Sequence, residues 1–427
     1  MLCLSIVLIT ILLIISSIIF FPVIKIKGLR MGSYWVIALL SALVLLCLKQ
    51  VSWDTMLQSF LSNSSVNPIK ILVLFISMTI LSIFLDEIGF FHFIASKATK
   101  LFKNNQLKLF FGFYALISIL TLFTSNDIII LTFTPFICYY AKNTKINPIP
   151  YLVLEFIAAN TWSMTLIIGN PTNIYLASSM NIDFLSYLKH MILPTIFASI
   201  TSLSLLYLIF KKQLSKPMEE YKADPIIPNR FLTAIGLIHL LLATGLLAIA
   251  SYIGLEMWII TISFATSLII IVLLYLCIKR KKITVLQATL LRAPWSLIPF
   301  VLSMFVIVLS LNEQGITSQI QSFLQGLPQI YSYGICGTIT ANLINNIPMS
   351  VFFSNLLTGA SSSAIYASII ASNISAFMTP LGALAGIMWM RLLKTYDINL
   401  RFKDFIFYGC SIGIPTLLIS LAALYIL

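Results

Sequence analysis

The sequence contains very little charge for its length. Of its 427 residues only 9% are charged and 59% are apolar, whereas an ordinary soluble domain has about 25% charged residues. A soluble protein of this composition could not cover its surface with polar groups, and a disordered chain has a much lower apolar content. The composition therefore excludes a water-soluble enzyme and an unfolded chain.

Several signatures of chemistry are also absent. The six cysteines are scattered singly without a C-x-x-C pair, so neither a zinc site nor a disulfide framework is indicated. The sequence has no G-x-x-x-x-G-K-[ST] loop, no H-E-x-x-H helix and no TVGYG filter, which excludes an ATPase, a zinc protease and a potassium channel. Only one carboxylate is well placed at depth, whereas an enzyme needs a paired acid or a nucleophile with its base. We therefore predict no enzyme activity, no catalytic residue, no metal and no cofactor.

Long apolar runs fill most of the chain. Because a helix needs about 20 apolar residues to cross a bilayer, we predict an all-α polytopic membrane protein of about ten spans. Two segments, 109–141 and 330–357, consist of two short apolar runs separated only by Ser125-Asn126 and Asn345-Asn346. We interpret them as re-entrant hairpins that enter and leave on the same side. The alternative is a pair of ordinary spans joined by a tight turn.

The basic residues orient these spans. Cytoplasmic loops collect Lys and Arg, and one topology places 23 of the 26 basic residues inside, with Lys49, Lys70 and Lys189 outside. It predicts an inner-membrane protein surrounded by lipid, with its N-terminus outside. The net charge of +13 then requires no nucleic-acid partner. The predicted cytoplasmic loops are 25–32, 92–108, 142–149, 211–230, 279–293 and 391–404.

An internal repeat divides the chain. Residues 85–90 resemble residues 311–316, yet the topology runs these two spans in opposite directions, as in the inverted repeats of secondary transporters. We expect a first half, 1–210, with the hairpin 109–141 and a broken span 150–179. A cytoplasmic linker, 211–230, leads to a second half, 231–427, with the hairpin 330–357 and a broken span 363–390.

Four polar clusters lie where apolar side chains are expected. Two are the hairpin tips and two are the interruptions of the broken spans, and opposite topology would bring all four together near the midplane. Polar groups at that depth are costly and usually functional, although helix caps and simple proline kinks are the alternatives. The candidate substrate-binding residues are Ser125, Asn126, Asn160, Asn170, Thr172, Asn173, Asn345, Asn346, Asn373 and Thr379. The candidate helix breaks are Gly169, Pro171, Pro348, Pro380 and Gly382.

Two acidic residues are candidates for ion coupling. Asp127 is the one carboxylate predicted at depth, and Glu155 lies about one turn inside its span. A deep carboxylate can carry a proton or a sodium ion. For Asp127 the alternative is a helix cap, and for Glu155 it is an interfacial carboxylate near Lys142 or Lys145.

At these motifs the sequence resembles the arsenical pump membrane proteins, or arsenite efflux permeases, of the ion transporter superfamily. The resemblance rests on residues 84–91, Ser125-Asn126-Asp127 with residues 131–135, Ala293-Pro294-Trp295, residues 345–348 and residues 379–385. The fold is similar to that of sodium/proton antiporters and anion or dicarboxylate permeases. The resemblance implies inverted repeats, re-entrant hairpins and ion-driven transport. The sequence departs from the family pattern at Asn160 and Asn373, where the family has aspartates.

The leading functional hypothesis is efflux of arsenite or antimonite coupled to the proton-motive force. With no thiolate trio to hold arsenic, we expect recognition of a neutral trihydroxide by Asn and Thr side chains and open backbone. The alternative is an anion or dicarboxylate permease or a sodium/proton antiporter of the same fold. The partner is thus a small inorganic solute or anion, and an ATPase subunit or a homodimer is left open.

Overall fold

The computed structural model describes residues 2–21, 23–26, 29–62, 67–101, 105–219, 229–250 and 253–426. The expected helical fold is confirmed, with one addition, a two-stranded antiparallel sheet formed by β1 (Val23–Ile26) and β2 (Leu29–Gly32). Parts of three predicted cytoplasmic loops, at 27–28, 102–104 and 220–228, lie outside the described residues.

The helices follow one another in the same order twice. Three helices come first: α1 (Leu2–Phe20), α2 (Ser33–Cys47) and α3 (Trp53–Leu61). The first series is α4 (Pro68–Glu87), α5 (Phe90–Leu101), α6 (Gln106–Phe123), α7 (Asn126–Thr144), α8 (Ile149–Trp162), η1 (Ile167–Gly169), α9 (Pro171–Ser179) and α10 (Phe184–Leu214).

After α11 (Arg230–Ile249), α12 (Met257–Ile278) and α13 (Thr284–Arg292), the order is repeated. The second series is α14 (Leu297–Glu313), α15 (Ile316–Gln325), α16 (Gln329–Ile344), α17 (Asn346–Leu356), α18 (Ser362–Ile374), η2 (Ser375–Phe377), α19 (Leu384–Thr395) and α20 (Phe402–Ala423). Each series therefore contains a span, a short amphipathic helix, a helical hairpin, a broken helix and a closing span.

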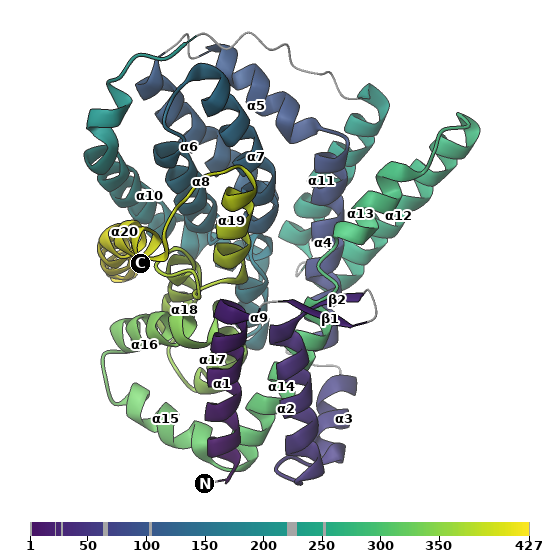
Figure 1. Cartoon of the computed structure of the whole chain (residues 1–427). Coiled ribbons are helices and arrows are strands. Elements are labelled where there is room, and N and C mark those ends of the chain that lie inside the picture. Colours follow the sequence, from purple (N-terminus) through teal and green to yellow (C-terminus); the bar gives the residue numbers. More distant parts are fainter. Residues whose placement is uncertain are drawn as a thin grey trace.

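The packing of the two series also corresponds. Helix α6 contacts α8 as α16 contacts α18, and the second arm of each hairpin contacts the broken helix of the other series, α7 against α19 and α17 against α9. Figure 1 shows the α6/α7 hairpin in the upper half of the molecule and the α16/α17 hairpin in the lower half. The two broken helices thus bring both hairpins to one region.

Polar side chains at the helix ends fix where several helices begin. Asn67 Oδ1 accepts hydrogen bonds from the backbone N–H groups of Ile69 and Lys70, and Asp183 does the same for the start of α10. Asn229 caps α11 in the same way. Such caps satisfy backbone donors that have no partner inside the helix.

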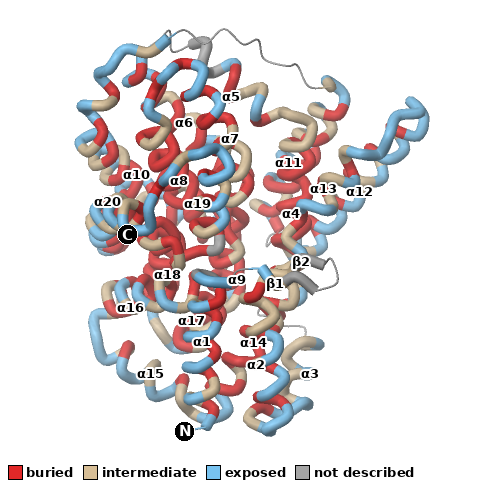
Figure 2. The backbone as a smooth tube through the Cα atoms, viewed as in Figure 1, coloured by how far each residue is buried: buried red, intermediate tan, exposed pale blue. Residues whose placement is uncertain are grey.

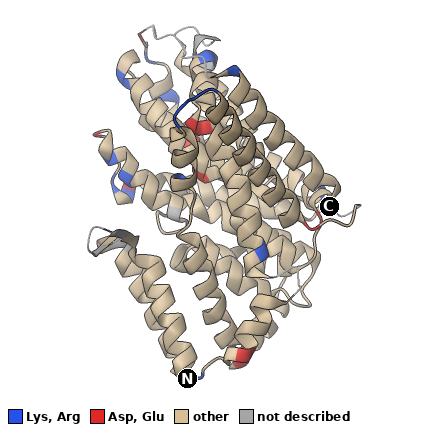
Figure 3. Cartoon of the chain, turned by 90° about the vertical axis from the view of Figure 1, so that its right-hand side faces the viewer, with Lys and Arg blue, Asp and Glu red and all other residues tan. Residues whose placement is uncertain are grey.

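The lengths and surfaces of the helices are those of a membrane protein. In the described part of the chain, seven helices are long and apolar enough to cross a bilayer. Buried residues concentrate in the central helices, whereas exposed residues follow the outer ones (Figure 2). Charged residues are sparse along the ribbon (Figure 3). Because many exposed residues on the outer helices are Leu, Ile and Phe, lipid rather than water is their natural surroundings.

The arms of the first hairpin are longer than the sequence indicated. Helices α6 and α7 contain 18 and 19 residues, because polar residues such as Gln106 and Lys142 continue each helix beyond its apolar run. The corresponding arms α16 and α17 contain 16 and 11 residues. Helix length therefore does not distinguish re-entry from crossing for the first hairpin, and re-entry stays a prediction.

Candidate functional site

One cavity lies where the two hairpin tips and the two broken helices meet. Its volume is about 260 Å³, and we call it the central cavity. Ser125, Asn126 and Asp127 of the first tip line it, as do Asn170 and Pro171 of the first broken helix. Asn346 and Ile347 of the second tip and Ala383 and Ala385 of the second broken helix complete this part of the wall.

Five helices begin at this cavity, namely α7, α9, α14, α17 and α19. The first residues of α7 and α9 line it, as do Asn346 and Ile347 at the start of α17 and Ala383, the N-cap of α19. A helix start carries unpaired backbone N–H groups and a partial positive charge. At α9 and α17 these N–H groups are already satisfied, because Asn170 and Asn345 cap the two helices and the N–H of Asn346 donates to the carbonyl of Gly382. The start of α7 has no side-chain cap and offers its backbone donors to an oxygen-rich solute.

The first tip presents unsatisfied acceptors to the same space. Asn160 Nδ2 donates to the carbonyl of Phe156 (2.7 Å), so its Oδ1 faces Asn126 and accepts from Asn126 Nδ2 (2.8 Å). This leaves Asn126 Oδ1 without a hydrogen-bond partner among the described residues, and Ser125 Oγ also has none. The two residues are only 2% and 4% exposed. Eight other buried side-chain atoms in the described residues also have no partner. These two are candidates for contact with a ligand because their residues line the cavity beside Asp127.

Asp127 is the acidic residue of the cavity. It lies at the second position of α7, is half-buried, and forms no ion pair within the described residues. Neither Asn126 nor Asp127 caps α7, since the N-cap residue is Ser125 and no side chain accepts a hydrogen bond there. The capping alternative for this tip is therefore wrong, and Asp127 remains available to a solute or a proton.

A compact cluster of hydrogen-bonded polar side chains joins the two broken helices. Asn373 accepts hydrogen bonds from Ser163 Oγ (2.8 Å) and Asn170 Nδ2 (3.1 Å) and donates to Asn173 Oδ1 (2.7 Å). Asn173 Nδ2 also donates to the carbonyl of Ser163 (2.8 Å). Thr172 Oγ1 pairs with Ser372 Oγ at 3.0 Å. Since Asn160, Thr172, Asn173 and Asn373 are fully buried and bonded to protein atoms, they hold the two breaks together.

The second tip is also bonded to its surroundings. Asn345 Nδ2 donates to the carbonyl of Leu381 (3.3 Å), and Asn346 Nδ2 donates to that of Ser372 (3.3 Å). The backbone N–H of Asn346 donates to the carbonyl of Gly382 at 3.0 Å. Thr379 Oγ1 donates to Asn342 Oδ1 at 2.7 Å, outside the central cavity.

The two breaks share a close backbone approach. A Cβ atom on Gly169 would lie 2.2 Å from the carbonyl oxygen of Ser163, and one on Gly382 would lie 2.1 Å from that of Ser375. Glycine is therefore required at both positions. Pro171 begins α9 and Pro380 lies in the turn before α19. Pro348 was expected to break its helix, but it lies in the first turn of α17, where a missing N–H costs no helical hydrogen bond.

Glu155 lies apart from this site. It is fully buried between α7 and α8, and both carboxylate oxygens accept from Thr134 Oγ1 (3.1 and 3.0 Å). The interfacial alternative is wrong, because Lys145 pairs instead with Glu219. Glu155 does not line the central cavity.

Several residues of the cavity wall were not predicted from the sequence. Arg292, Tyr34, Thr79 and Ser296 all line the central cavity, and Tyr34 donates a hydrogen bond to Ser296 Oγ (3.0 Å). Arg292 forms ion pairs with Asp86 (2.7 Å) and with Glu87. Arg292 immediately precedes the Ala293-Pro294-Trp295 motif and Asp86-Glu87 belongs to another motif, but no local pattern in the sequence indicates that the two motifs pair.

Comparison with known proteins agrees with this architecture. The family profile described as "Citrate transporter" (CitMHS) matches residues 11–371. The chain belongs to this transporter family. It is a multi-pass membrane transporter and not an enzyme.

Individual relatives are similar over most of the chain. An arsenical pump membrane protein of Escherichia coli K12 is 26% identical over 379 residues, which cover 82% of this chain and 84% of that protein. One from Yersinia enterocolitica is 25% identical over 375 residues, with the same coverage. The resemblance to arsenical pump membrane proteins is thereby confirmed. The crystal structure of the YdaH transporter of Alcanivorax borkumensis shares the fold, with a TM-score of 0.56 at 13% identity over 100% of this chain and 97% of that one.

Proposed function

We propose that this protein is a secondary transporter that exports arsenite or antimonite through the central cavity, in exchange for protons. The observation that carries the proposal is the pair of unpaired buried acceptors, Ser125 Oγ and Asn126 Oδ1, beside the Asp127 carboxylate. Because Asn126 already donates through its amide nitrogen, its oxygen can only accept. A solute that fits this tip must donate hydrogen bonds.

A neutral trihydroxide meets this requirement. Its hydroxyl groups would donate to Ser125, Asn126 and Asp127, and its oxygens would accept from the uncapped backbone N–H groups at the start of α7. A fully ionised anion has no donor for Asn126 Oδ1 and is repelled by Asp127. The names of the relatives in Escherichia coli and Yersinia enterocolitica support the same substrate class.

Asp127 couples the exchange in this proposal. Its carboxylate accepts either a proton or a hydroxyl of the solute, so the two compete for the same oxygens. Loading of a proton on one side releases the solute, and release of the proton on the other side restores the acceptor. No covalent bond of the solute changes in this cycle.

The second candidate is uptake of an anion such as a carboxylate. The five helix starts around the cavity and Arg292 in its wall favour negative charge, and the description of the matching family is a citrate transporter. In this case Arg292 would leave Asp86 and Glu87 to contact the anion.

Flux into proteoliposomes decides between the two. Purified protein is reconstituted and offered arsenite, antimonite, citrate and sulfate under an imposed pH gradient, with and without sodium. We expect arsenite and antimonite flux that follows the pH gradient. Sodium-dependent or pH-dependent citrate flux without arsenite flux would contradict the proposal and support the second candidate.

A further inference from the structure

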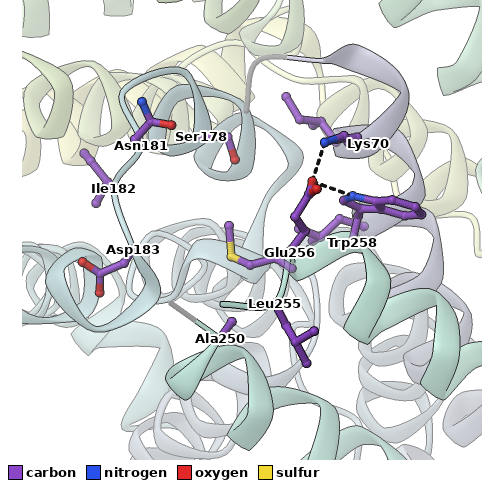
Figure 4. A pocket seen from close by; sticks show the side chains of 12 residues that line it. Lys70, Ser178, Asn181, Ile182, Asp183, Ala250, Leu255, Glu256 and Trp258 are labelled. Atoms are coloured by element: carbon purple, nitrogen blue, oxygen red, sulfur yellow. Dashed lines mark hydrogen bonds and ion pairs between the residues drawn. The ribbon is translucent and has the colours of Figure 1, made fainter. Parts of the chain in front are cut away.

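A larger pocket lies beside the central cavity. It has a volume of about 420 Å³ and is formed by the start of α4, the connection between α9 and α10, and the connection between α11 and α12. Figure 4 shows Lys70, Glu256 and Trp258 on one side and Asn181, Ile182 and Asp183 on the other. We call it the Lys70 pocket.

The Lys70 pocket offers both donors and acceptors. Glu256 forms an ion pair with Lys70 and accepts from Trp258 Nε1 at 2.8 Å. The Lys70 ammonium and the Trp258 N–H therefore hold the pKa of Glu256 below its ordinary value. The side chains of Asn181 and Ser178 add an amide and a hydroxyl to the lining.

The same helix faces line both cavities. On α9, Pro171 lines the central cavity and Ser178 lines the Lys70 pocket. Seven residues are close to two helical turns, so these two residues share a face and lie about 10 Å apart along the axis. On α4, Ile71 lines the Lys70 pocket, while Phe75 and Thr79 line the central cavity at successive intervals of four residues. Helices α4 and α9 also pack against each other.

Along α4 the lining changes from one space to the other at two buried apolar side chains. Leu74 lines the Lys70 pocket and the next residue, Phe75, lines the central cavity. Each is only 3% exposed, and the two spaces are separate in this structure. Alternating access requires a route from the central site to each membrane face. Apolar side chains between the two cavities on such a route would act as a gate.

We propose that the Lys70 pocket is a second solute site, a vestibule on the transport route that Leu74 and Phe75 seal from the central cavity. The inference rests on the proposed function and deepens it, since the ligand is the same small, oxygen-rich solute. Lys70 and Asn181 contribute donors to the hydrated solute, and Glu256 and Asp183 contribute acceptors, while the Trp258 N–H holds Glu256 in place. The ion pair between Lys70 and Glu256 links the start of α4 to the start of α12 in the wall of this pocket.

Two neighbouring exposed positions give a matched test. Leu255 lines the pocket and Ile253 does not, although both lie in the α11–α12 connection and both are 46% exposed. Each is replaced by Cys in a chain whose six native cysteines are replaced, and the reconstituted protein is treated with a bulky, membrane-impermeant thiol reagent. Arsenite, antimonite and citrate flux are measured before and after labelling.

We expect labelling of Leu255→Cys to reduce flux at least about tenfold, because the adduct fills a pocket the solute must cross. Labelled Ile253→Cys should retain its flux within about twofold, as for a surface change. Equal flux from both labelled proteins would overturn the vestibule while leaving the proposed function intact. No flux of any solute before labelling would contradict the proposed function and the vestibule with it. Should the cysteine-replaced chain fail to fold, Leu255→Trp and Ile253→Trp in the native chain give the same comparison.

Discussion

The two hairpin tips hold equivalent places in the two halves of the chain but use their polar atoms differently. At the first tip Ser125 Oγ and Asn126 Oδ1 have no partner among the described residues, and Asp127 follows them. At the second tip the amide nitrogens of Asn345 and Asn346 bind backbone carbonyls of the broken helix, and the apolar Ile347 follows them.

The difference separates a binding role from a structural one. At both tips the amide nitrogen of the last Asn is bonded to the protein. The first tip differs in the unpaired Ser125 Oγ and in the Asp127 carboxylate, where the second tip has Asn345, whose Oδ1 accepts from the backbone N–H of Ile347, and the apolar Ile347 itself. The close glycine contacts, by contrast, are nearly identical in the two halves. The repeat thus keeps one architecture for the breaks while only one tip carries the proposed binding chemistry.

The largest effect is expected from removing the carboxylate that distinguishes the first tip. In Asp127→Asn, flux driven by a pH gradient should fall about 100-fold, since a deep carboxylate is the proposed proton carrier. Asp404→Asn is the control, because Asp404 pairs with Arg401 at the surface, and its flux should be unchanged. Normal flux with unchanged pH dependence in Asp127→Asn would remove this residue from the coupling mechanism.

The glycines test whether the two breaks are alike. Gly169→Ala and Gly382→Ala each place a Cβ against a backbone carbonyl, so each should lower the free energy of unfolding by about 2 kcal/mol. Gly245→Ala is the control, because nothing lies within 4 Å of its Cβ position in α11; it should be neutral or stabilising. Chemical unfolding in detergent measures all three. A large effect at only one break would show that the two breaks are not equivalent.

The smallest effect is expected at the Lys70 pocket. Since the folded-state pKa of Glu256 lies below its ordinary value, the stabilisation from its ion pair is present at neutral pH and is lost as the pH falls through the folded pKa. Glu256→Gln should therefore cost about 0.5 kcal/mol at pH 7, and progressively less as the pH falls below the ordinary glutamate pKa of about 4.3 and through the lower folded-state pKa. Thermal unfolding at pH 7 and across the acid range tests this, and a difference that does not change with pH would contradict the assignment.

Much of the fold followed from the sequence alone. Apolar runs predicted the long helices. The polar interruptions at Ser125-Asn126 and Gly169–Asn173 predicted where the chain turns or a helix breaks, because polar groups at membrane depth are tolerated only where protein or a water-filled cavity surrounds them. The lengths of α6 and α7 could not be predicted from hydropathy, since polar residues such as Gln106 continue those helices into the interface.

The sequence could not predict which polar residues of the site are bonded to the protein and which are free to contact a solute. All ten predicted binding residues are polar and lie near breaks, yet only the three-dimensional contacts separate bonded side chains such as Asn373 from unpaired ones such as Asn126. Likewise, Arg292 joins the central cavity from a helix far along the chain. Contacts between segments that are far apart in the sequence produce no local sequence pattern from which they could be predicted.

The central claim is that the solute binds at the first tip and that the second tip is structural. The most direct measurement is arsenite flux of Asn126→Ala and Asn346→Ala at equal amounts of folded protein, together with their unfolding free energies. Each variant removes a buried hydrogen bond to the protein, so we expect both to lose about 1 kcal/mol of stability. Only Asn126→Ala should also lose at least about tenfold in apparent affinity. The reverse pattern of affinity loss would contradict the account.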